Sequence, residues 1–417
     1  MSKLVVEGCR KLQGEAKVQG SKNSTLPILA ATIVTKDENV IHNCPCLTDI
    51  DASVRILRFL GCTATRSGHT LVVNTKDMCT DEIPTSLMRE MRSSIIFLGA
   101  ILAREGSARL SFPGGCELGA RPIDLHLDAL RKLGAIITEH HGKIDCCAPK
   151  GLEGAKIALA FPSVGATENI MIAATLAKGV TVISNAAREP EIEDLADYLN
   201  HCGANITGAG EGTIIIEGVQ RLSGTAHTVI SDRIVAATLM TAAAITGSDI
   251  VLSDVVGGHL QAVVPVFEQA GCDVDISGGK LRLYSPQRLD AFGMVRTTPY
   301  PGFPTDAQAP VMAMATVAKG TTVFVETVFE NRYKHVGEFV RMGACVKSEG
   351  RVAVVQGVDE LYSAPVQAQD LRGSAALVVA AMAAQGVSEI DTTKYLDRGY
   401  EEFDVVLQSL GANVRKI

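Results

Sequence analysis

The chain has 417 residues, more than a single hydrophobic core usually serves, so it predicts two domains or one long repeat architecture. A hydrophobic content of 47% argues against disorder, and a formal net charge of -7 argues against a general nucleic-acid binder, which needs a basic face. Residues 1–4 lack the layout of a signal peptide and no apolar run is long enough to cross a bilayer, so we expect a cytoplasmic protein that acts on small molecules.

A short pattern recurs six times along the chain: a helical stretch, a glycine, then a short strand. Successive glycines are 73, 69, 68, 72 and 68 residues apart, which indicates a repeated unit of about 70 residues. Each glycine follows an amphipathic helix, such as 192–201 or 263–269, and is predicted to adopt the left-handed conformation that ends a helix. The six glycines are Gly61, Gly134, Gly203, Gly271, Gly343 and Gly411.

The remainder of each unit repeats as well. Two short strands follow the glycine, then a Gly-x-x-x-Leu turn and a further strand, and then a second helix that is apolar on nearly every face. A helix without a polar stripe is buried on all sides, so each unit is predicted to be βαβαββ with one inner and one outer helix. The predicted inner helices include 170–177, 235–244, 310–318 and 375–384.

The N-terminal segment has the form of the strand pair that completes a unit. Residues 4–8 and 12–14 supply this form, whereas the last unit stops at 414–417 without such a pair. We therefore expect the first segment to finish the last unit. The predicted domains are 22–231, with three repeats, and 1–21 plus 232–417, also with three repeats. Two chain crossings between them would permit hinge closure over a ligand.

Polar and charged residues gather where the inner helices are predicted to begin. Helix N-termini carry unpaired N–H groups and positive potential, so they suit phosphates and carboxylates. Ordinary helix capping by Ser163, Ser231, Thr305 and Asp370 is an alternative explanation. Capping alone does not explain why cationic side chains occur at the starts of these helices. These side chains are Lys22, Arg92, Arg233 and Arg372.

Residues 112–126 read Phe-Pro-Gly-Gly-Cys-Glu-Leu-Gly-Ala-Arg-Pro-Ile-Asp-Leu-His and resemble the signature loop of the UDP-N-acetylglucosamine 1-carboxyvinyltransferases, a family of enolpyruvyl transferases. The resemblance covers essentially the whole chain. It implies a two-domain inside-out α/β barrel built from six βαβαββ repeats. It also implies transfer of the enolpyruvyl group of phosphoenolpyruvate to the 3-hydroxyl of UDP-N-acetylglucosamine, the first committed step of peptidoglycan synthesis in the cytoplasm, without a metal or cofactor. Further matching stretches are 19–23, 161–169, 187–191, 303–306, 327–332, 370–372 and 397–400.

The resemblance also implies site residues. Lys22, Arg121 and Arg398 match positions that grip phosphoenolpyruvate, a small anion that requires several cations. Cys116 matches a general acid or covalent nucleophile, and Asp306 matches the base for the sugar 3-hydroxyl. The implied substrate contacts are Asn23, Arg92, Arg121, Pro122, Ile123, Asp124, Leu125, Ser163, Val164, Gly165, Val328, Arg332, Asp370 and Arg372.

Two positions depart from the family pattern, because Thr48 stands where some relatives carry a basic contact and Phe161 replaces a polar residue. Three other functions stay open: a 5-enolpyruvylshikimate-3-phosphate synthase-like transferase, a non-catalytic UDP-sugar-binding paralogue, and a thiol redox sensor. Eleven cysteines show no paired C-x-x-C, so most are expected to pack as small hydrophobes, with the two close pairs Cys44-x-Cys46 and Cys146-Cys147 as weak metal candidates. The oligomeric state is left open.

Overall fold

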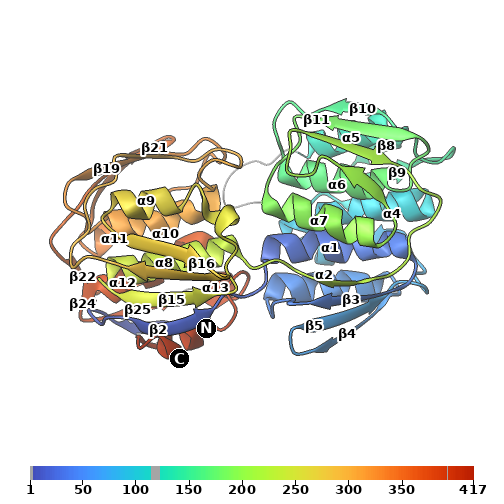
Figure 1. The fold of residues 1–417 in the computed structure, drawn as a ribbon. Coiled ribbons are helices and arrows are strands. Elements are labelled where there is room, and N and C mark those ends of the chain that lie inside the picture. The colour runs from blue at the N-terminus through green and yellow to red at the C-terminus, as the bar shows by residue number, and fades with distance from the viewer. Residues whose placement is uncertain (1–2, 114–122, 392) are drawn as a thin grey trace. The chain divides into compact units, whose positions relative to one another are not determined.

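The computed structural model describes residues 3–113, 123–391 and 393–417. Their contacts divide into two compact units: unit 1 contains residues 3–19 and 231–417, and unit 2 contains residues 20–113 and 123–230. Each unit has its own hydrophobic core. Figure 1 shows the helices and strands of both units. The predicted closure of two domains over a ligand, with boundaries near residues 21 and 231, stays a prediction.

Unit 2 alternates helices and strands along the chain. Its elements in the described residues are α1 (Lys22–Thr35), β3 (Glu38–His42), α2 (Thr48–Phe59), β4 (Thr63–Ser67), β5 (Thr70–Asn74), β6 (Glu82–Ile83), α3 (Thr85–Met88), the 3-10 helix η1 (Arg92–Ile96), α4 (Phe97–Glu105), β7 (Ser107–Ser111), α5 (Asp124–Lys132), β8 (Ile136–His140), β9 (Lys143–Cys147), β10 (Lys156–Ala158), α6 (Val164–Ala174), β11 (Val180–Ser184), α7 (Pro190–His201), β12 (Asn205–Thr207), β13 (Thr213–Glu217) and β14 (Ala226–Thr228).

Unit 1 repeats the same order after two N-terminal strands. Its elements in the described residues are β1 (Leu4–Glu7), β2 (Gln13–Lys17), α8 (Arg233–Ile245), β15 (Asp249–Ser253), the 3-10 helix η2 (Gly257–Leu260), α9 (Val264–Gln269), β16 (Asp273–Ser277), β17 (Lys280–Tyr284), β18 (Met294–Arg296), α10 (Thr305–Ala315), β19 (Thr321–Val325), α11 (Val336–Arg341), β20 (Cys345–Glu349), β21 (Val352–Gln356), β22 (Leu361–Tyr362), β23 (Pro365–Gln367), α12 (Leu371–Ala383), β24 (Ala384–Gln385), β25 (Val387–Asp391), α13 (Thr393–Leu396), α14 (Phe403–Ser409) and β26 (Asn413–Lys416).

Across the described residues, six four-stranded sheets share one pattern. In the sheet β10-β11-β13-β12, the first two strands are parallel and the remaining neighbours are antiparallel. An inner helix joins the first strand to the second, an outer helix leads to β12, and a hairpin leads to β13. This is the predicted βαβαββ unit.

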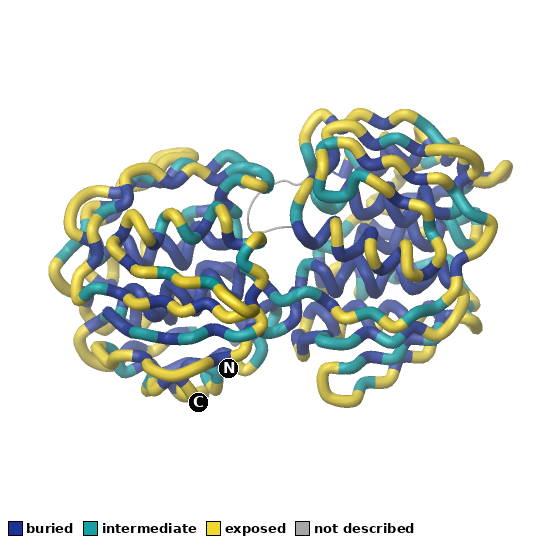
Figure 2. Tube along the Cα trace, viewed as in Figure 1, coloured by how far each residue is buried: buried dark blue, intermediate teal, exposed yellow. Residues whose placement is uncertain are grey.

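The inner helices form the centre of each unit. In unit 1, α8, α10 and α12 pack against one another, and α1, α4 and α6 lie inside unit 2 (Figure 2). Almost every residue of α12 is buried, whereas the outer helix α7 exposes one face. The prediction of fully buried inner helices is therefore confirmed. The predicted inner helices start two to six residues late, because the apolar pattern did not include the first residues of these helices. Pro310, for example, lies inside α10 rather than at its start.

The six repeated glycines all have positive φ, between 91° and 100°, as the pattern predicts. A second set of glycines follows the strand that is third in the order of its sheet. A Cβ on Gly357 would lie 1.6 Å from Ala318 O, one on Gly218 would lie 1.6 Å from Ala177 O, and one on Gly8 would lie 1.9 Å from Ala384 O. Only glycine lets these strand ends approach the C-terminal end of the inner helix so closely.

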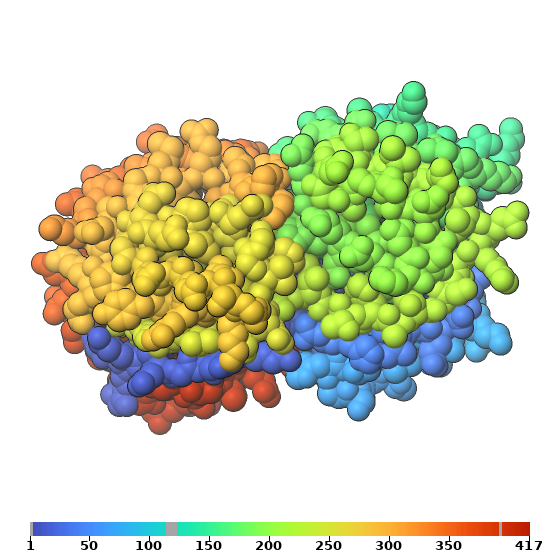
Figure 3. Space-filling view, viewed as in Figure 1, coloured from blue at the N-terminus to red at the C-terminus, as the bar shows by residue number. Residues whose placement is uncertain are grey.

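The N-terminal strands belong to two different sheets. Strand β1 lies antiparallel between β25 and β26, so it supplies the missing strand of the last sheet, as predicted. Strand β2 instead lies parallel to β15 in another sheet, so the expectation that both strands finish the last unit was wrong. The reason is general to the fold, because the strand after each hairpin crosses to the neighbouring sheet, as β10 and β18 do. Figure 3 shows this N-terminal segment in blue on the surface of unit 1.

Strand β14 closes unit 2 in the same way. It comes from the end of that unit and pairs parallel with β3 near its start, with His227 opposite Ile41.

In the described ranges, the helices are all too short or too polar to span a bilayer.

Candidate active site

The N-termini of the inner helices of unit 1 carry a cluster of charged side chains. Asp232 caps α8 by accepting from Ile234 N at 2.9 Å, and Asp370 caps α12 by accepting from Gly373 N at 2.9 Å. Helix α10 begins at Thr305, so Asp306 lies in its first turn. Because these three helices pack side by side, their N-terminal ends bring the predicted residues together.

Asp306 lies between two guanidinium groups. Its Oδ1 accepts from Arg332 Nη2 at 2.8 Å, and its Oδ2 accepts from Arg372 Nη2 at 2.9 Å. The Asp306 side chain is 28% exposed, whereas both arginine side chains are 2% exposed. An ionised carboxylate acts as an acceptor, so this partly exposed group suits proton transfer from a bound hydroxyl.

Arg372 is charged although it is buried. Burial is the largest single effect and opposes the charge, but Asp306, Tyr400 and Asp232 together outweigh burial and raise the pKa of the guanidinium. Its Cζ lies 5.4 Å from the centre of the Tyr400 ring. Nε and Nη1 of Arg372 find no hydrogen-bond partner in the described part of the chain. A buried guanidinium with donors to spare, beside helix N-termini, suits an anionic ligand.

Val328 lies in the loop after β19. Its backbone N–H donates to Glu326 Oε1 at 2.7 Å, and Glu326 Oε2 accepts from Thr305 Oγ1 at 2.8 Å. The loop that carries Val328 is thereby bonded to the start of α10. The sequence pattern did not single out Glu326, although it is the charged residue that directly follows an apolar strand and is 1% exposed. Arg398, the remaining predicted cation of unit 1, is half-buried in the turn after α13, where its backbone N–H donates to Tyr395 O at 3.2 Å.

Unit 2 holds Lys22 at the start of α1. Lys22 Nζ lies 2.7 Å from Asp49 Oδ2, and the two side chains are only 8% and 5% exposed. Ser21 caps this helix by accepting from Ser24 N, and Asn23 beside it is half-buried. Asp49 comes from the first turn of α2 and was not expected from the sequence, because the two residues are far apart in the chain.

A second polar group in unit 2 surrounds the start of α6. Ser163 caps this helix by accepting from Ala166 N at 3.4 Å, so Val164 and Gly165 form its first turn. A Cβ on Gly165 would lie 3.2 Å from the His126 ring, so glycine allows the imidazole to approach the helix start. Burial, with a smaller contribution from Arg92, lowers the pKa of His126 to about 4, which keeps this ring neutral.

The predicted positions Ile123, Asp124 and Leu125 lie at the start of α5, where Ile123 is buried and Asp124 is exposed. Arg92 opens η1, five residues before α4, so the expectation that it begins an apolar α-helix was wrong by one turn of 3-10 helix. Of the predicted residues, Asp306, Val328, Arg332, Asp370, Arg372 and Arg398 lie in unit 1; Lys22, Asn23, Arg92, Ile123, Asp124, Leu125, Ser163, Val164 and Gly165 lie in unit 2; Cys116, Arg121 and Pro122 lie outside the described residues.

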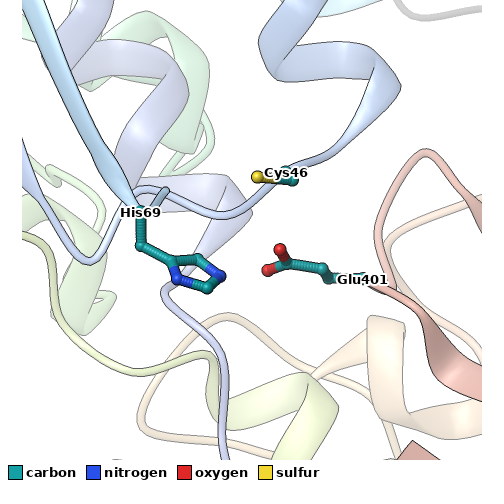
Figure 4. Close-up of side chains that lie close together, drawn as sticks. All are labelled: Cys46, His69 and Glu401. Carbon is teal, nitrogen blue, oxygen red and sulfur yellow. The ribbon is translucent and has the colours of Figure 1, made fainter. Parts of the chain in front are cut away.

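The Cys44-x-Cys46 pair is one of the two close cysteine pairs at which the sequence left a metal open. Cys46 precedes α2, and His69 lies in the turn between β4 and β5; both belong to unit 2, whereas Glu401, also drawn in Figure 4, belongs to unit 1. Arg66 Nη1 donates to Cys46 Sγ at 3.4 Å. Two ligands are fewer than a zinc site uses, and the neighbouring guanidinium opposes a cation, so we assign no metal here.

Comparison with known proteins identifies the family to which the chain belongs. The family model described as EPSP synthase (3-phosphoshikimate 1-carboxyvinyltransferase) matches residues 6–407. The chain is 48% identical to UDP-N-acetylglucosamine 1-carboxyvinyltransferase 2 of Caldanaerobacter subterraneus subsp. tengcongensis, with 100% of both chains covered. It is 46% identical to the UDP-N-acetylglucosamine 1-carboxyvinyltransferase of Trichlorobacter lovleyi, with 100% of this chain and 99% of the relative covered.

Solved structures confirm the fold. The enolpyruvyl transferase NikO from Streptomyces tendae superposes with a TM-score of 0.90 at 23% identity, covering 100% of this chain and 98% of that one. EPSP synthase from Acinetobacter baumannii superposes with a TM-score of 0.75 at 18% identity, with 100% of both chains covered. The chain therefore belongs to the EPSP synthase family of enolpyruvyl transferases and, within it, to the UDP-N-acetylglucosamine 1-carboxyvinyltransferases.

Proposed function

We propose that this protein transfers the enolpyruvyl group of phosphoenolpyruvate to the 3-hydroxyl of UDP-N-acetylglucosamine and releases phosphate. The relatives that share 46–49% of its residues over essentially the full length carry the name of this activity. The observation that carries the proposal is Asp306, a partly exposed carboxylate held by two buried guanidinium groups at a helix N-terminus. The proposed reaction uses soluble substrates and belongs in the cytoplasm, as an early step of peptidoglycan synthesis.

The proposed reaction is an addition followed by an elimination. Asp306 accepts the proton of the sugar 3-hydroxyl while the oxygen forms a bond to C2 of phosphoenolpyruvate. A general acid, the role assigned to Cys116, delivers a proton to C3, which gives a tetrahedral adduct. The adduct then loses a proton from C3, and the C2–O bond to phosphate breaks. The products are the enol ether and inorganic phosphate, with no net oxidation.

Cations are needed because phosphoenolpyruvate carries both a phosphate and a carboxylate. We assign this role to Lys22, Arg121 and Arg398. Arg92 and Arg372 are proposed as further substrate contacts. Arg372 supports the assignment because two of its donor nitrogens are buried without a partner among the described residues. Lys22 is paired with Asp49, so anion binding must compete with that carboxylate or add to the pair.

Contacts to the UDP-sugar are proposed for the remaining residues. The first turn of α6 offers backbone N–H groups at a helix N-terminus, which suits the diphosphate. The proposed contacts are Asn23, Arg121, Pro122, Ile123, Asp124, Leu125, Ser163, Val164 and Gly165 from the unit 2 segments, and Asp306, Val328, Arg332 and Asp370 from unit 1.

A phosphate-release assay tests the proposal against its nearest rival. The purified chain is supplied with phosphoenolpyruvate and either UDP-N-acetylglucosamine or shikimate 3-phosphate, which is the acceptor that the family model's description favours. We expect phosphate release only with the UDP-sugar, and a loss of about 100-fold or more in Asp306→Asn. Release with shikimate 3-phosphate alone would overturn the assignment, and binding of UDP-N-acetylglucosamine without release would indicate a non-catalytic paralogue.

A further inference from the structure

Glu326 is a buried carboxylate that the proposed reaction does not use directly. It follows β19 and is 1% exposed. Its Oε1 accepts from Val328 N at 2.7 Å and from Phe329 N at 3.0 Å. Its Oε2 accepts from Thr305 Oγ1 at 2.8 Å. Removal of this side chain would leave three partly buried donors without their acceptor.

These three bonds join two parts of the proposed site. Thr305 is the first residue of α10 and directly precedes the proposed base, Asp306. Val328 is the proposed sugar contact and lies two residues after Glu326. One carboxylate therefore sets both the entry of the helix that carries the base and the turn that carries the sugar contact.

Arg332 holds the same helix start from the other side. Its Nη2 donates to Thr305 O at 3.0 Å as well as to Asp306 Oδ1 at 2.8 Å. Thr305 is thus fixed through its hydroxyl by Glu326 and through its carbonyl by a guanidinium. When the bond to Glu326 is removed, the bond from Arg332 to the Thr305 carbonyl is the one of these two that remains. The first turn of α10 can then shift.

We propose that Glu326 is a positioning residue that fixes the Asp306 carboxylate relative to the Val328 loop for the transfer reaction. This inference rests on the proposed function. A shift of about 1 Å at a reacting group costs on the order of 100-fold in rate, so the effect on turnover is measurable. A purely structural role would lower the thermal stability without changing the kinetic constants of the folded enzyme.

Two substitutions at Glu326 separate these roles. In Glu326→Ala all three bonds are lost, and we expect kcat to fall by about 10-fold to 100-fold, with KM for UDP-N-acetylglucosamine raised more than KM for phosphoenolpyruvate. In Glu326→Gln the amide oxygen still accepts the two backbone N–H groups and the amide nitrogen donates to Thr305 Oγ1, so the kinetic constants are expected to recover to within about threefold of the wild type.

A double-mutant cycle tests the link to the helix. Thr305→Val removes the hydroxyl, and the double variant with Glu326→Ala should lose less than the product of the two single losses, because both break one bond. The matched control is Phe324→Leu, which disturbs a buried residue of the strand that precedes Glu326, and it should lower the thermal midpoint without changing kcat or KM. Wild-type constants in stably folded Glu326→Ala would overturn the proposal, as would full multiplicativity in the cycle.

Hydrogen exchange keeps this test independent of the reaction itself. The amide hydrogens of Val328 and Phe329 should exchange faster in Glu326→Ala and at wild-type rates in Glu326→Gln. If the wild-type chain releases no phosphate from either acceptor, the proposed function fails, whereas unchanged exchange at both amides would contradict the positioning role itself.

Discussion

Glu168 is a carboxyl group in α6 that the fold buries beside other carboxylates. It is 3% exposed. Burial, with added repulsion from Glu191 and Glu189, raises the pKa of Glu168 from 4.5 to about 8. The folded protein therefore keeps this side chain protonated at neutral pH. The perturbation that isolates this effect is Glu168→Gln, which keeps the shape of the side chain and cannot ionise.

The sign of the pH dependence follows from the raised pKa. Below pH 4.5 the carboxyl is protonated in both the folded and the unfolded chain, so it does not oppose folding. Between pH 4.5 and about 8 the unfolded chain releases the proton and the folded chain keeps it, so the free energy of unfolding falls as the pH rises. Above about 8 both states are ionised and the loss is complete. At about 1.4 kcal/mol for each pKa unit, the full window has a ceiling of about 5 kcal/mol.

Urea unfolding between pH 4.5 and 8.5 is the assay. The midpoint of the wild type should fall relative to that of Glu168→Gln as the pH rises, and the two should approach each other near pH 4.5. Glu211→Gln, at an exposed loop position of the same unit, is the matched control and should follow the wild type throughout. Parallel profiles for the wild type and Glu168→Gln across this range would refute the reasoning.

Three further predictions concern the buried Lys22–Asp49 ion pair, the close contacts of the glycines and the thiol of Cys116. Asp49→Ala should lower the free energy of unfolding by about 3–5 kcal/mol, because Lys22 is left buried without this partner; a loss below about 1 kcal/mol in urea unfolding would contradict it. Gly357→Ala should cost at least about 3 kcal/mol through its clash with Ala318 O, whereas Gly337→Ala, in open space within α11, should be neutral or stabilising; equal thermal midpoints would count against the close approach. An epoxide phosphonate that mimics phosphoenolpyruvate should alkylate Cys116, and a mass shift on a different cysteine would remove that residue from its role.

Much of the fold follows from local patterns that the sequence displays directly. The glycines at Gly203 and Gly343 mark helix ends because a left-handed residue is required there, and both have positive φ. The apolar helices predicted the buried cores because a helix without a polar face is buried on all sides. The partner of β2 could not be predicted, because pairing with β15 joins segments more than 230 residues apart and depends on how neighbouring repeats share strands.

The candidate site was predictable in its residue types but not in its contacts. Asp306 and Arg372 were expected at helix starts, whereas their ion pair depends on the packing of α10 against α12. Asp49 and Glu326 were missed because neither forms a pattern with nearby residues. Each acts through a buried bond to a helix start, Lys22 in one unit and Thr305 in the other, and such bonds appear only when the chain is folded.

Analysis of the product tests the central claim most directly. The chain is incubated with UDP-N-acetylglucosamine and phosphoenolpyruvate labelled with carbon-13 at C2, and the sugar product is examined by mass spectrometry and NMR. We expect a product with one enolpyruvyl group joined through C2 to the sugar 3-oxygen, formed together with one phosphate. The amount of this product should be strongly reduced in Asp306→Asn. Phosphate release without a labelled sugar, or a label on another oxygen, would contradict it.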